Sequence, residues 1–294
     1  MRIFPSFLSQ RPAALLPVVV ALVLFVGCDS TGGLDDNSNV TVTAEETAES
    51  IALSLAESSG GAASDFSDAA AIAGGAVASM AKDLNRSRNC SYDSDTQIWT
   101  CTVEVNGSLG RIDTVDFDRE YRAQFFAEDT EVRRPADADS MTFEIVEGSG
   151  EFKTARLSRS HELLEGTTWA FRQAPDNTTY AIHLLSTEAG RNVEAEAEGR
   201  DGNRSRTREA KIRKTSVENL VLRRGVGLVE GTIEGSYEAD VEIERADDST
   251  VSRSVNLTYV ATFTEDGAQI TLTGGGDRFN GQTFEFNRQT GELE

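Results

Sequence analysis

The segment Val115–Phe125 reads VDFDREYRAQF, and its side chains alternate between apolar and polar types. Arg119 breaks the alternation, because it stands on the apolar side. The same period of two recurs at Trp99–Val105, Tyr237–Glu244 and Ser254–Phe263. This period is typical of antiparallel strands that bury one face and expose the other, so the runs predict a mainly β chain.

About a dozen such strands fit between Arg88 and Phe286, separated by turn dipeptides such as Asn106-Gly107 and Asp266-Gly267. A run of hairpins this long must curl, close or split into two packed sheets. We therefore expect residues 85–294 to form a large antiparallel, curled sheet or an open barrel-like meander. The best candidate for an internal break in this domain lies near residues 133–140.

Before the alternating runs, the apolar period is that of a helix. Thr43 and Glu46 have the spacing of a capping box, in which side chain and backbone satisfy each other at a helix start. Apolar residues then recur every three or four positions, at Ala44, Ala48, Ile51, Ala52, Leu55 and Ala56. Ser58–Gly61 should end this helix, and Ser64 is expected to cap a second one. We expect two alanine-rich helices within residues 44–84, packed on or into the sheet.

The N-terminal residues combine two arginines, Arg2 and Arg11, with the charge-free run Ala13–Val26. That run has about 14 residues, fewer than the ~20 that a spanning helix needs, and it fits the apolar region of a signal peptide. We therefore assign residues 1–27 to an export signal. Residues 28–43 are mostly small and polar, which indicates a flexible tether.

The export signal ends in the junction Gly27-Cys28. This junction resembles the lipobox of bacterial lipoproteins, a family in which the cysteine is lipidated and becomes the mature N-terminus. The resemblance covers the signal alone and implies nothing about the fold of the remaining chain. It implies that Cys28 is lipidated and that the protein is exported and held in the bacterial cell envelope by a lipid anchor. Which membrane, which leaflet and which oligomeric state stay open.

The net charge and the residue composition of the chain exclude several classes of function. The chain has 49 acidic and 28 basic side chains and a net charge of -21, which argues against nucleic acid as a partner because the chain repels phosphate. Three cysteines and two histidines do not supply a Cys/His metal site. His161 and His183 are isolated, which is typical of structural or solvated histidines. The sequence contains no nucleophile elbow, zinc-protease motif or phosphate-binding loop, so we predict no catalytic residue and no cofactor.

Two cysteines remain once Cys28 is set aside, and an exported protein meets an oxidising compartment. We therefore predict a disulfide between Cys90 and Cys101. If the two face each other across a hairpin, Tyr92 falls opposite Trp99 and adds an aromatic pair to the staple.

The basic side chains of the C-terminal half gather in one cluster. Its members are Arg204, Arg206, Arg208, Lys211, Arg213 and Lys214. One interpretation is a contact for anionic lipid headgroups or polysaccharide. The other, which we favour, is an internal partner, because Glu194, Glu196 and Glu198 lie just upstream and charge pairs across a hairpin are common.

Two registers of this hairpin compete. A three-residue loop at Arg200–Gly202 pairs Glu198 with Arg204 and builds a ladder of opposite charges. A two-residue turn at Asp201-Gly202 pairs Glu198 with Ser205 and sends the arginines to the other face. We predict the ladder, because it keeps opposite charges together. If the ladder is wrong, the anionic-ligand interpretation gains weight.

Two function hypotheses follow. The first is a lipid-anchored, non-enzymatic cell-envelope lipoprotein that acts as a structural or ligand-binding module, in which a curled sheet with a helix at its mouth could hold an apolar ligand. The alternative is a surface-anchored hydrolase that acts on glycans through a carboxylate pair. A cluster of Asp or Glu in a cleft would support the hydrolase, a filled interior the structural role, and an apolar cavity the carrier.

Overall fold

Two helices and a large antiparallel sheet make up the part of the chain that the computed structural model describes, which is residues 42–74, 84–109, 112–175, 178–198, 205–245 and 247–294. These residues belong to the compact unit Val40–Glu294. The helical elements are α1 (Ala44–Leu55), α2 (Ala62–Gly74) and the short 3-10 turn η1 (Pro135–Asp137). The strands are β1 (Leu84–Asp93), β2 (Ile98–Leu109), β3 (Ile112–Ala127), β4 (Thr130–Val132), β5 (Ser140–Thr154), β6 (Leu157–Leu163), β7 (Thr167–Gln173), β8 (Thr179–Leu184), β9 (Ala189–Glu198), β10 (Ser205–Arg223), β11 (Gly227–Glu244), β12 (Thr250–Phe263), β13 (Ala268–Gly274) and β14 (Thr283–Phe286).

All these strands join one sheet, with neighbours in the order β1-β2-β3-β5-β6-β9-β10-β11-β12-β13-β14. β4 pairs with β3, and the hairpin β7–β8 makes a second connection between β5 and β10. β5 therefore pairs with β7 along its first half and with β6 along its second. The prediction of a mainly β chain with a large antiparallel sheet is confirmed.

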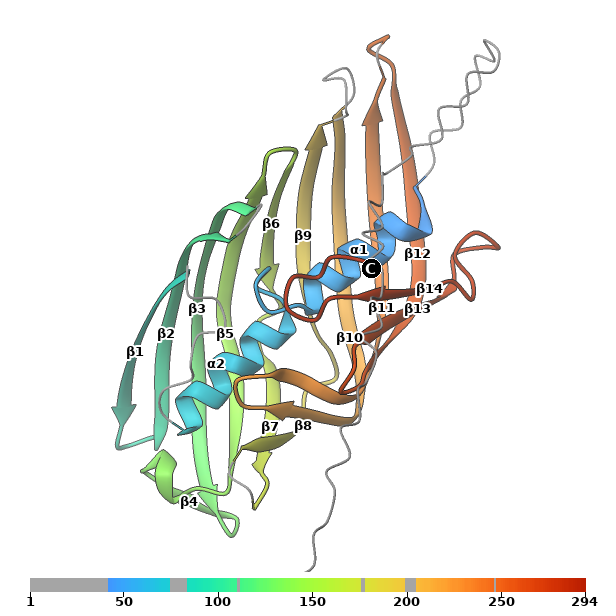
Figure 1. The fold of residues 1–294 in the computed structure, drawn as a ribbon. Coiled ribbons are helices and arrows are strands. Elements are labelled where there is room, and N and C mark those ends of the chain that lie inside the picture. The colour runs from blue at the N-terminus through green and yellow to red at the C-terminus, as the bar shows by residue number, and fades with distance from the viewer. Residues whose placement is uncertain (1–41, 75–83, 110–111, 176–177, 199–204, 246) are drawn as a thin grey trace, which may run out of the picture. The chain divides into compact units, whose positions relative to one another are not determined.

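Both helices lie across the same face of the sheet, which we call the helix-side face (Figure 1). On β3, Phe117 and Tyr121 are buried on this face, whereas Asp116 and Asp118 are exposed on the opposite, outer face. The core thus lies between the helices and the sheet. Within the described part of the chain, no helix is both long and apolar enough to cross a bilayer.

The helix starts were predicted with mixed success. The capping box of α1 is present, since the Glu46 N–H donates to Thr43 Oγ1 and the Thr43 N–H donates to the Glu46 carboxylate. The prediction that Ser64 caps the second helix is wrong, because α2 begins at Ala62. Ser64 is buried within the first turn and instead accepts hydrogen bonds from two arginines of the sheet. The rest of the expected helical segment, residues 75–83, lies outside the described residues.

Two expectations about connections changed. Asn106-Gly107 is not a turn, because it lies inside β2, where the register with β3 shifts after Gly107. The candidate break at residues 133–140 coincides with the connection from β4 to β5 through η1, and both strands pair with β3. Asp266-Gly267 does connect two strands, β12 and β13.

The first hairpin carries the predicted disulfide. Cys90 and Cys101 are directly opposite across β1 and β2, with their Cα atoms 4.1 Å apart and their sulfur atoms at bonding distance. Tyr92 faces Trp99 in the same register, and the two ring centroids are 5.2 Å apart. The covalent and aromatic pairs therefore fix the register of this edge of the sheet.

Candidate ligand-binding site

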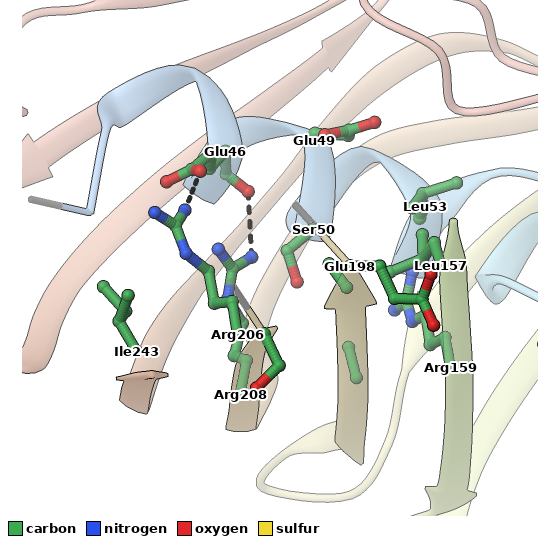
Figure 2. Close-up of a pocket in the computed structure, with 13 residues that line it drawn as sticks. Glu46, Glu49, Ser50, Leu53, Leu157, Arg159, Glu198, Arg206, Arg208 and Ile243 are labelled. Atoms are coloured by element: carbon green, nitrogen blue, oxygen red, sulfur yellow. Dashed lines mark hydrogen bonds and ion pairs between the residues drawn. The ribbon is translucent and has the colours of Figure 1, made fainter. Parts of the chain in front are cut away.

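A cavity of about 330 Å³ lies between α1 and four neighbouring strands of the sheet, β6, β9, β10 and β11. Figure 2 shows the side chains that line it, with Glu46 and Glu49 on the helix above the arginines of the strands. From α1 the lining takes Glu46, Glu49, Ser50 and Leu53. Their spacing of three or four residues places them on one face of the helix, above the sheet.

The strand registers arrange the floor of the cavity in rows that cross the sheet. The first row, nearest the strand ends, contains Leu157, Ala197, Arg206 and Ile243. The second row, one step deeper, contains Arg159, Ala195 and Arg208. Glu198 and Ser205 form the rim at the ends of β9 and β10. Most apolar side chains of the floor therefore lie in the first row, and two arginines lie in the second.

The charge of Arg206 in the first row is balanced by the helix. Its Nη1 donates to the Glu46 carboxylate, which also accepts the N–H of Thr43 in the capping box. Nη1 of Arg208 donates to the Glu46 carbonyl oxygen over 3.1 Å. Glu46 thus connects the first turn of α1 to β10 through these two contacts, which are the dashed lines of Figure 2.

Arg159 in the second row is not balanced in this way. Only 4% of the residue is exposed, yet its Nε and Nη1 have no hydrogen-bond partner among the residues that the structure describes. Nε of the neighbouring Arg208 is also buried without a partner there. Burial, with a further contribution from Arg191, lowers the pKa of Arg159 to about 9, which still leaves the guanidinium charged at neutral pH.

Glu49 of the cavity lining interacts electrostatically with both arginines of the second row. Burial raises the pKa of the Glu49 carboxyl, although the charges of Arg208 and Arg159 oppose the rise. The residue as a whole is nevertheless exposed, and no ion pair joins its carboxylate to Arg159 or Arg208 among the described residues. The second row is left with an excess of positive charge and unsatisfied N–H groups, an arrangement that can bind an anion.

A second group of buried charges lies beneath α2, and we call it the α2 network. Arg119 Nη1 lies 3.2 Å from Asp65 Oδ1 and 3.3 Å from Asp68 Oδ2, while Nη2 donates to the Gly60 carbonyl oxygen over 2.9 Å. Arg191 also binds Asp65 and the Gly60 carbonyl, and the Tyr121 hydroxyl bonds both carboxylates. Arg86 adds a second ion pair to Asp68, at 2.9 Å.

Gly60 is required at the centre of the α2 network. Its φ of 69° lies in the left-handed region, which side chains with a Cβ adopt at a cost. A Cβ there would also lie 2.7 Å from Arg119 Nη2 and from the Phe117 ring. The turn between the helices therefore presents its carbonyl to two arginines because it has no side chain.

His161 and Lys214 occupy the helix-side face near both groups of charges. Burial lowers the pKa of His161 well below its ordinary value, so the ring is neutral, and its Nε2 has no partner within the described chain. Its ring centroid lies 5.5 Å from that of Phe117, which the missing side chain of Gly150 permits. Burial and Arg191 lower the pKa of Lys214 to about 7.

The basic cluster predicted from the sequence is divided by the sheet. Arg206 and Arg208 line the cavity on the helix-side face, and Lys214 is buried on the same face. Lys211 and Arg213 lie on the outer face, where Arg213 donates to Asn192 Oδ1 and to the Arg191 carbonyl. Arg204 lies outside the described residues.

The predicted ladder of glutamates and arginines is wrong. Glu198 pairs with Ser205 and Glu194 with Glu209, so Glu194 and Glu196 face the opposite side from the arginines of the cavity, and Glu198 lies at the rim. The ladder would have placed Val193 opposite Glu209 and turned Ala210 and Ile212 toward solvent. Burying an aliphatic side chain contributes ~1.5–3 kcal/mol, more than the ~0.2–1 kcal/mol of an exposed charge pair, so the apolar face sets the register.

The sequence analysis did not single out Arg159, Arg191, Asp65 or Asp68 as site residues. The sequence does contain a signal for the two arginines. Each stands on the apolar side of its strand, where the alternation predicts a buried residue, as Arg119 does. Leu157, Arg159, His161 and Leu163 share one side of β6, and Ala189, Arg191 and Val193 share one side of β9. A cation at a position that the period assigns to the core predicts a buried partner or a binding site.

The remaining sequence-based expectations are placed as follows. Cys28, the predicted lipidation site, lies outside the described residues. His183 lies on β8 and is exposed. In the part of the chain that is described, no group of three or more His, Cys, Asp or Glu side chains is placed to hold a metal ion. Comparison with protein-family models, curated proteins and solved structures found no match for this chain.

Proposed function

We propose that this protein is a lipid-anchored, non-enzymatic binding module of the bacterial cell envelope, and that its ligand occupies the cavity beneath α1. The observation that carries the proposal is the cavity itself. Its volume of about 330 Å³ falls within the ~300–1,000 Å³ typical of small-molecule sites. Its lining combines apolar side chains with a few convergent polar groups, which is the usual composition of such sites.

The apolar part of the lining favours a lipid over a polysaccharide as the ligand. Leu53, Leu157 and Ile243, with Ala195 and Ala197, offer no hydrogen-bonding side chains to the hydroxyl groups of a sugar. An acyl chain, in contrast, gains ~0.8 kcal/mol for each methylene group that it buries against such a surface. The failure of the predicted ladder supports an anionic ligand, lipid or polysaccharide alike, because Arg206 and Arg208 line the cavity while Glu194 and Glu196 face the other side of the sheet.

The alternative of a glycan hydrolase receives less support. The buried carboxylates Asp65 and Asp68 are bound by arginines and do not line the cavity. They therefore do not form the free carboxylate pair that the alternative requires. The cavity itself is lined by three glutamates, Glu46, Glu49 and Glu198. Of these, however, Glu46 is bound by Arg206, and a hydrolase stays a prediction.

The anchor is tested through Cys28. Several acyl chains on one cysteine give stable membrane attachment, because each buried methylene contributes ~0.8 kcal/mol. We expect Cys28→Ser to move the protein from the membrane to the soluble fraction of the cell. A variant that stays membrane-bound and is processed at the same position would contradict the anchor.

The cavity is tested by filling it. Native mass spectrometry of the protein purified from its own membrane should show a bound small molecule. Ala197→Trp places a large ring in the first row and should abolish that bound mass. Thr207→Trp, on the exposed outer face of β10, is the matched control and should retain it. The same bound mass in both variants would remove the cavity from consideration.

A further inference from the structure

We propose that the cavity binds a single-chain amphiphile with a small anionic head, a carboxylate or a phosphate monoester, and that the head enters first and lies against Arg159. This inference rests on the proposed function and adds the class of ligand and its direction. It is argued from the order of side chains along the strands that form the floor.

The first step concerns charge. Arg206 in the first row is neutralised by Glu46, so it adds no net attraction for an anion. In the second row, Nε and Nη1 of Arg159 and Nε of Arg208 are buried without partners in the described chain. Leaving a guanidinium in this state is costly, because buried charges are normally paired and hydrogen-bonded. A carboxylate or phosphate oxygen would satisfy these N–H groups and balance the charge.

The second step concerns Glu49, an exposed residue of α1 at the edge of the cavity. No ion pair joins its carboxylate to Arg159 among the described residues. Because the side chain is exposed to solvent, its repulsion of an incoming anion is screened. Glu49 therefore leaves the buried nitrogens of Arg159 open to an anionic head.

The third step concerns direction. From the rim inward, the floor presents the exposed Glu198, then Leu157, Ala197 and Ile243 of the first row, and then the arginines of the second. Arg159 is 4% exposed, whereas the Arg206 side chain is 25% exposed. The unbalanced charge thus lies one row further from the strand ends than Leu157, Ala197 and Ile243, and it is more buried than the charge of Arg206. An amphiphile matches this order when its head points inward and its chain runs outward along the first row and Leu53.

The fourth step concerns size. A volume of about 330 Å³ is near the lower limit for small-molecule sites, so it accommodates one chain and not several. A head that must reach Arg159 past the first row also has to be small. A free fatty acid or an alkyl phosphate fits this description, and a phospholipid with a bulky headgroup does not.

The experiment measures binding of matched amphiphiles to the full chain that carries Cys28→Ser. This variant has no acylation site, so the measurement is made without detergent. Isothermal titration compares dodecanoate, dodecyl phosphate, dodecanol, dodecyltrimethylammonium and the lysophosphatidylcholine with the same acyl chain. We expect dodecanoate or dodecyl phosphate to bind roughly 10- to 100-fold more tightly than dodecanol, as expected for one or two charge-assisted hydrogen bonds. The cationic amphiphile and the lysophospholipid should bind no better than dodecanol. Whether the carboxylate or the phosphate binds more tightly identifies the head.

Three variants assign the preference to Arg159. Arg159→Leu should reduce the affinity for the anionic probes to that for dodecanol, while dodecanol itself still binds. Arg159→Lys retains a cation and should keep part of the preference, which guards against misfolding as the cause of a loss. Arg253→Leu, the same change at an exposed position of β12, should leave all affinities unchanged.

The outcomes separate the two proposals. If no probe binds at all, charged or neutral, the proposed function fails. If neutral and anionic probes bind equally, or if Arg159→Leu keeps the preference, the function stands and the anionic head is wrong. If the lysophospholipid binds as tightly as dodecanoate, the head does not point inward, and the proposed direction is overturned.

Discussion

The two helices cover two groups of buried cations that differ in how they are satisfied. Beneath α2, Arg119 and Arg191 share two carboxylates, a tyrosine hydroxyl and the Gly60 carbonyl. Beneath α1, Arg159 is also buried but has two nitrogens, Nε and Nη1, without a partner in the described chain. Arg119 and Arg191 thus bind partners through both terminal nitrogens and leave only Nε without one in the described chain, whereas Arg159 on the same face leaves both Nε and Nη1 without a partner.

The difference separates a structural role from a binding role. A buried ion-pair network contributes little net stability, but breaking it is expensive because it leaves a charge uncompensated. An open guanidinium already carries that cost in the absence of a ligand, so removing it should cost nothing. Stability measurements on matched variants therefore distinguish the two regions.

The largest effect is expected in the α2 network. Arg119→Met leaves Asp65 and Asp68 buried with fewer cations, and the free energy of unfolding should fall by about 3–5 kcal/mol. Arg122→Met is the control, because Arg122 is exposed on the outer face of the same strand and its ion pair to Glu144 is 3.9 Å long. The control should change stability by less than about 1 kcal/mol in urea unfolding. A loss below about 1 kcal/mol in Arg119→Met would mean that the network is not structural.

A smaller loss is expected at the turn that serves this network. Gly60→Ala combines a left-handed backbone with the approach of a Cβ to Arg119, and it should cost about 2–4 kcal/mol. Gly166→Ala shares the left-handed φ, but its Cβ would meet nothing within 4 Å, so it should cost only about 1 kcal/mol. The difference between the two variants, measured by thermal or urea unfolding, reports the contact with the network. Equal losses would show that backbone conformation alone makes Gly60 necessary.

Lys214 adds a pH dependence that the α2 network should influence. Burial, with the charge of Arg191, lowers its pKa from 10.5 to about 7, whereas Asp65 opposes this and Arg213 adds to it. Between these two pH values the unfolded chain binds more protons than the folded one, so the Lys214 contribution makes stability rise with pH. Lys214→Met should remove this contribution. The free energy of unfolding of the wild type should therefore rise relative to that of Lys214→Met by about 1–2 kcal/mol from about pH 7 to about pH 8.5. Identical pH profiles of unfolding would show that Lys214 is not strained by burial.

The sequence predicted the fold class because its signals are local. Alternation at Val115–Phe125 sets the buried face of β3, the capping box sets the start of α1, and two cysteines of one hairpin set its register. The site was not predicted, because it depends on contacts across distant parts of the chain. Arg159 on β6 and Glu46 on α1 meet at the cavity only after β6, β9 and β10 have become neighbours.

The hairpin of β9 and β10 shows where local reasoning fails. The charges of its two strands favour one register, and the apolar residues Val193, Ala210 and Ile212 favour the other. The sequence analysis left Ala210 and Ile212 out of the comparison, but burial of the apolar face that they complete contributes more free energy than the exposed charge pairs. The resulting register moves Arg206 and Arg208 to the helix-side face and helps to create the site. Weighing both faces of each strand would have predicted this outcome.

The smallest effect on stability is expected at the open cation, which makes it the sharpest test of the comparison. Arg159→Leu removes a buried charge whose Nε and Nη1 are unsatisfied and replaces it with a shorter, apolar side chain. Replacing buried charges by apolar residues is often neutral or stabilising, so the free energy of unfolding without ligand should change by less than about 1 kcal/mol, or rise. Urea unfolding of Arg159→Leu beside Arg119→Met, in ligand-free protein, measures both regions under the same conditions. A loss of about 3 kcal/mol or more in Arg159→Leu would show that this arginine is as structural as Arg119, and the contrast between the two helices would no longer identify a site.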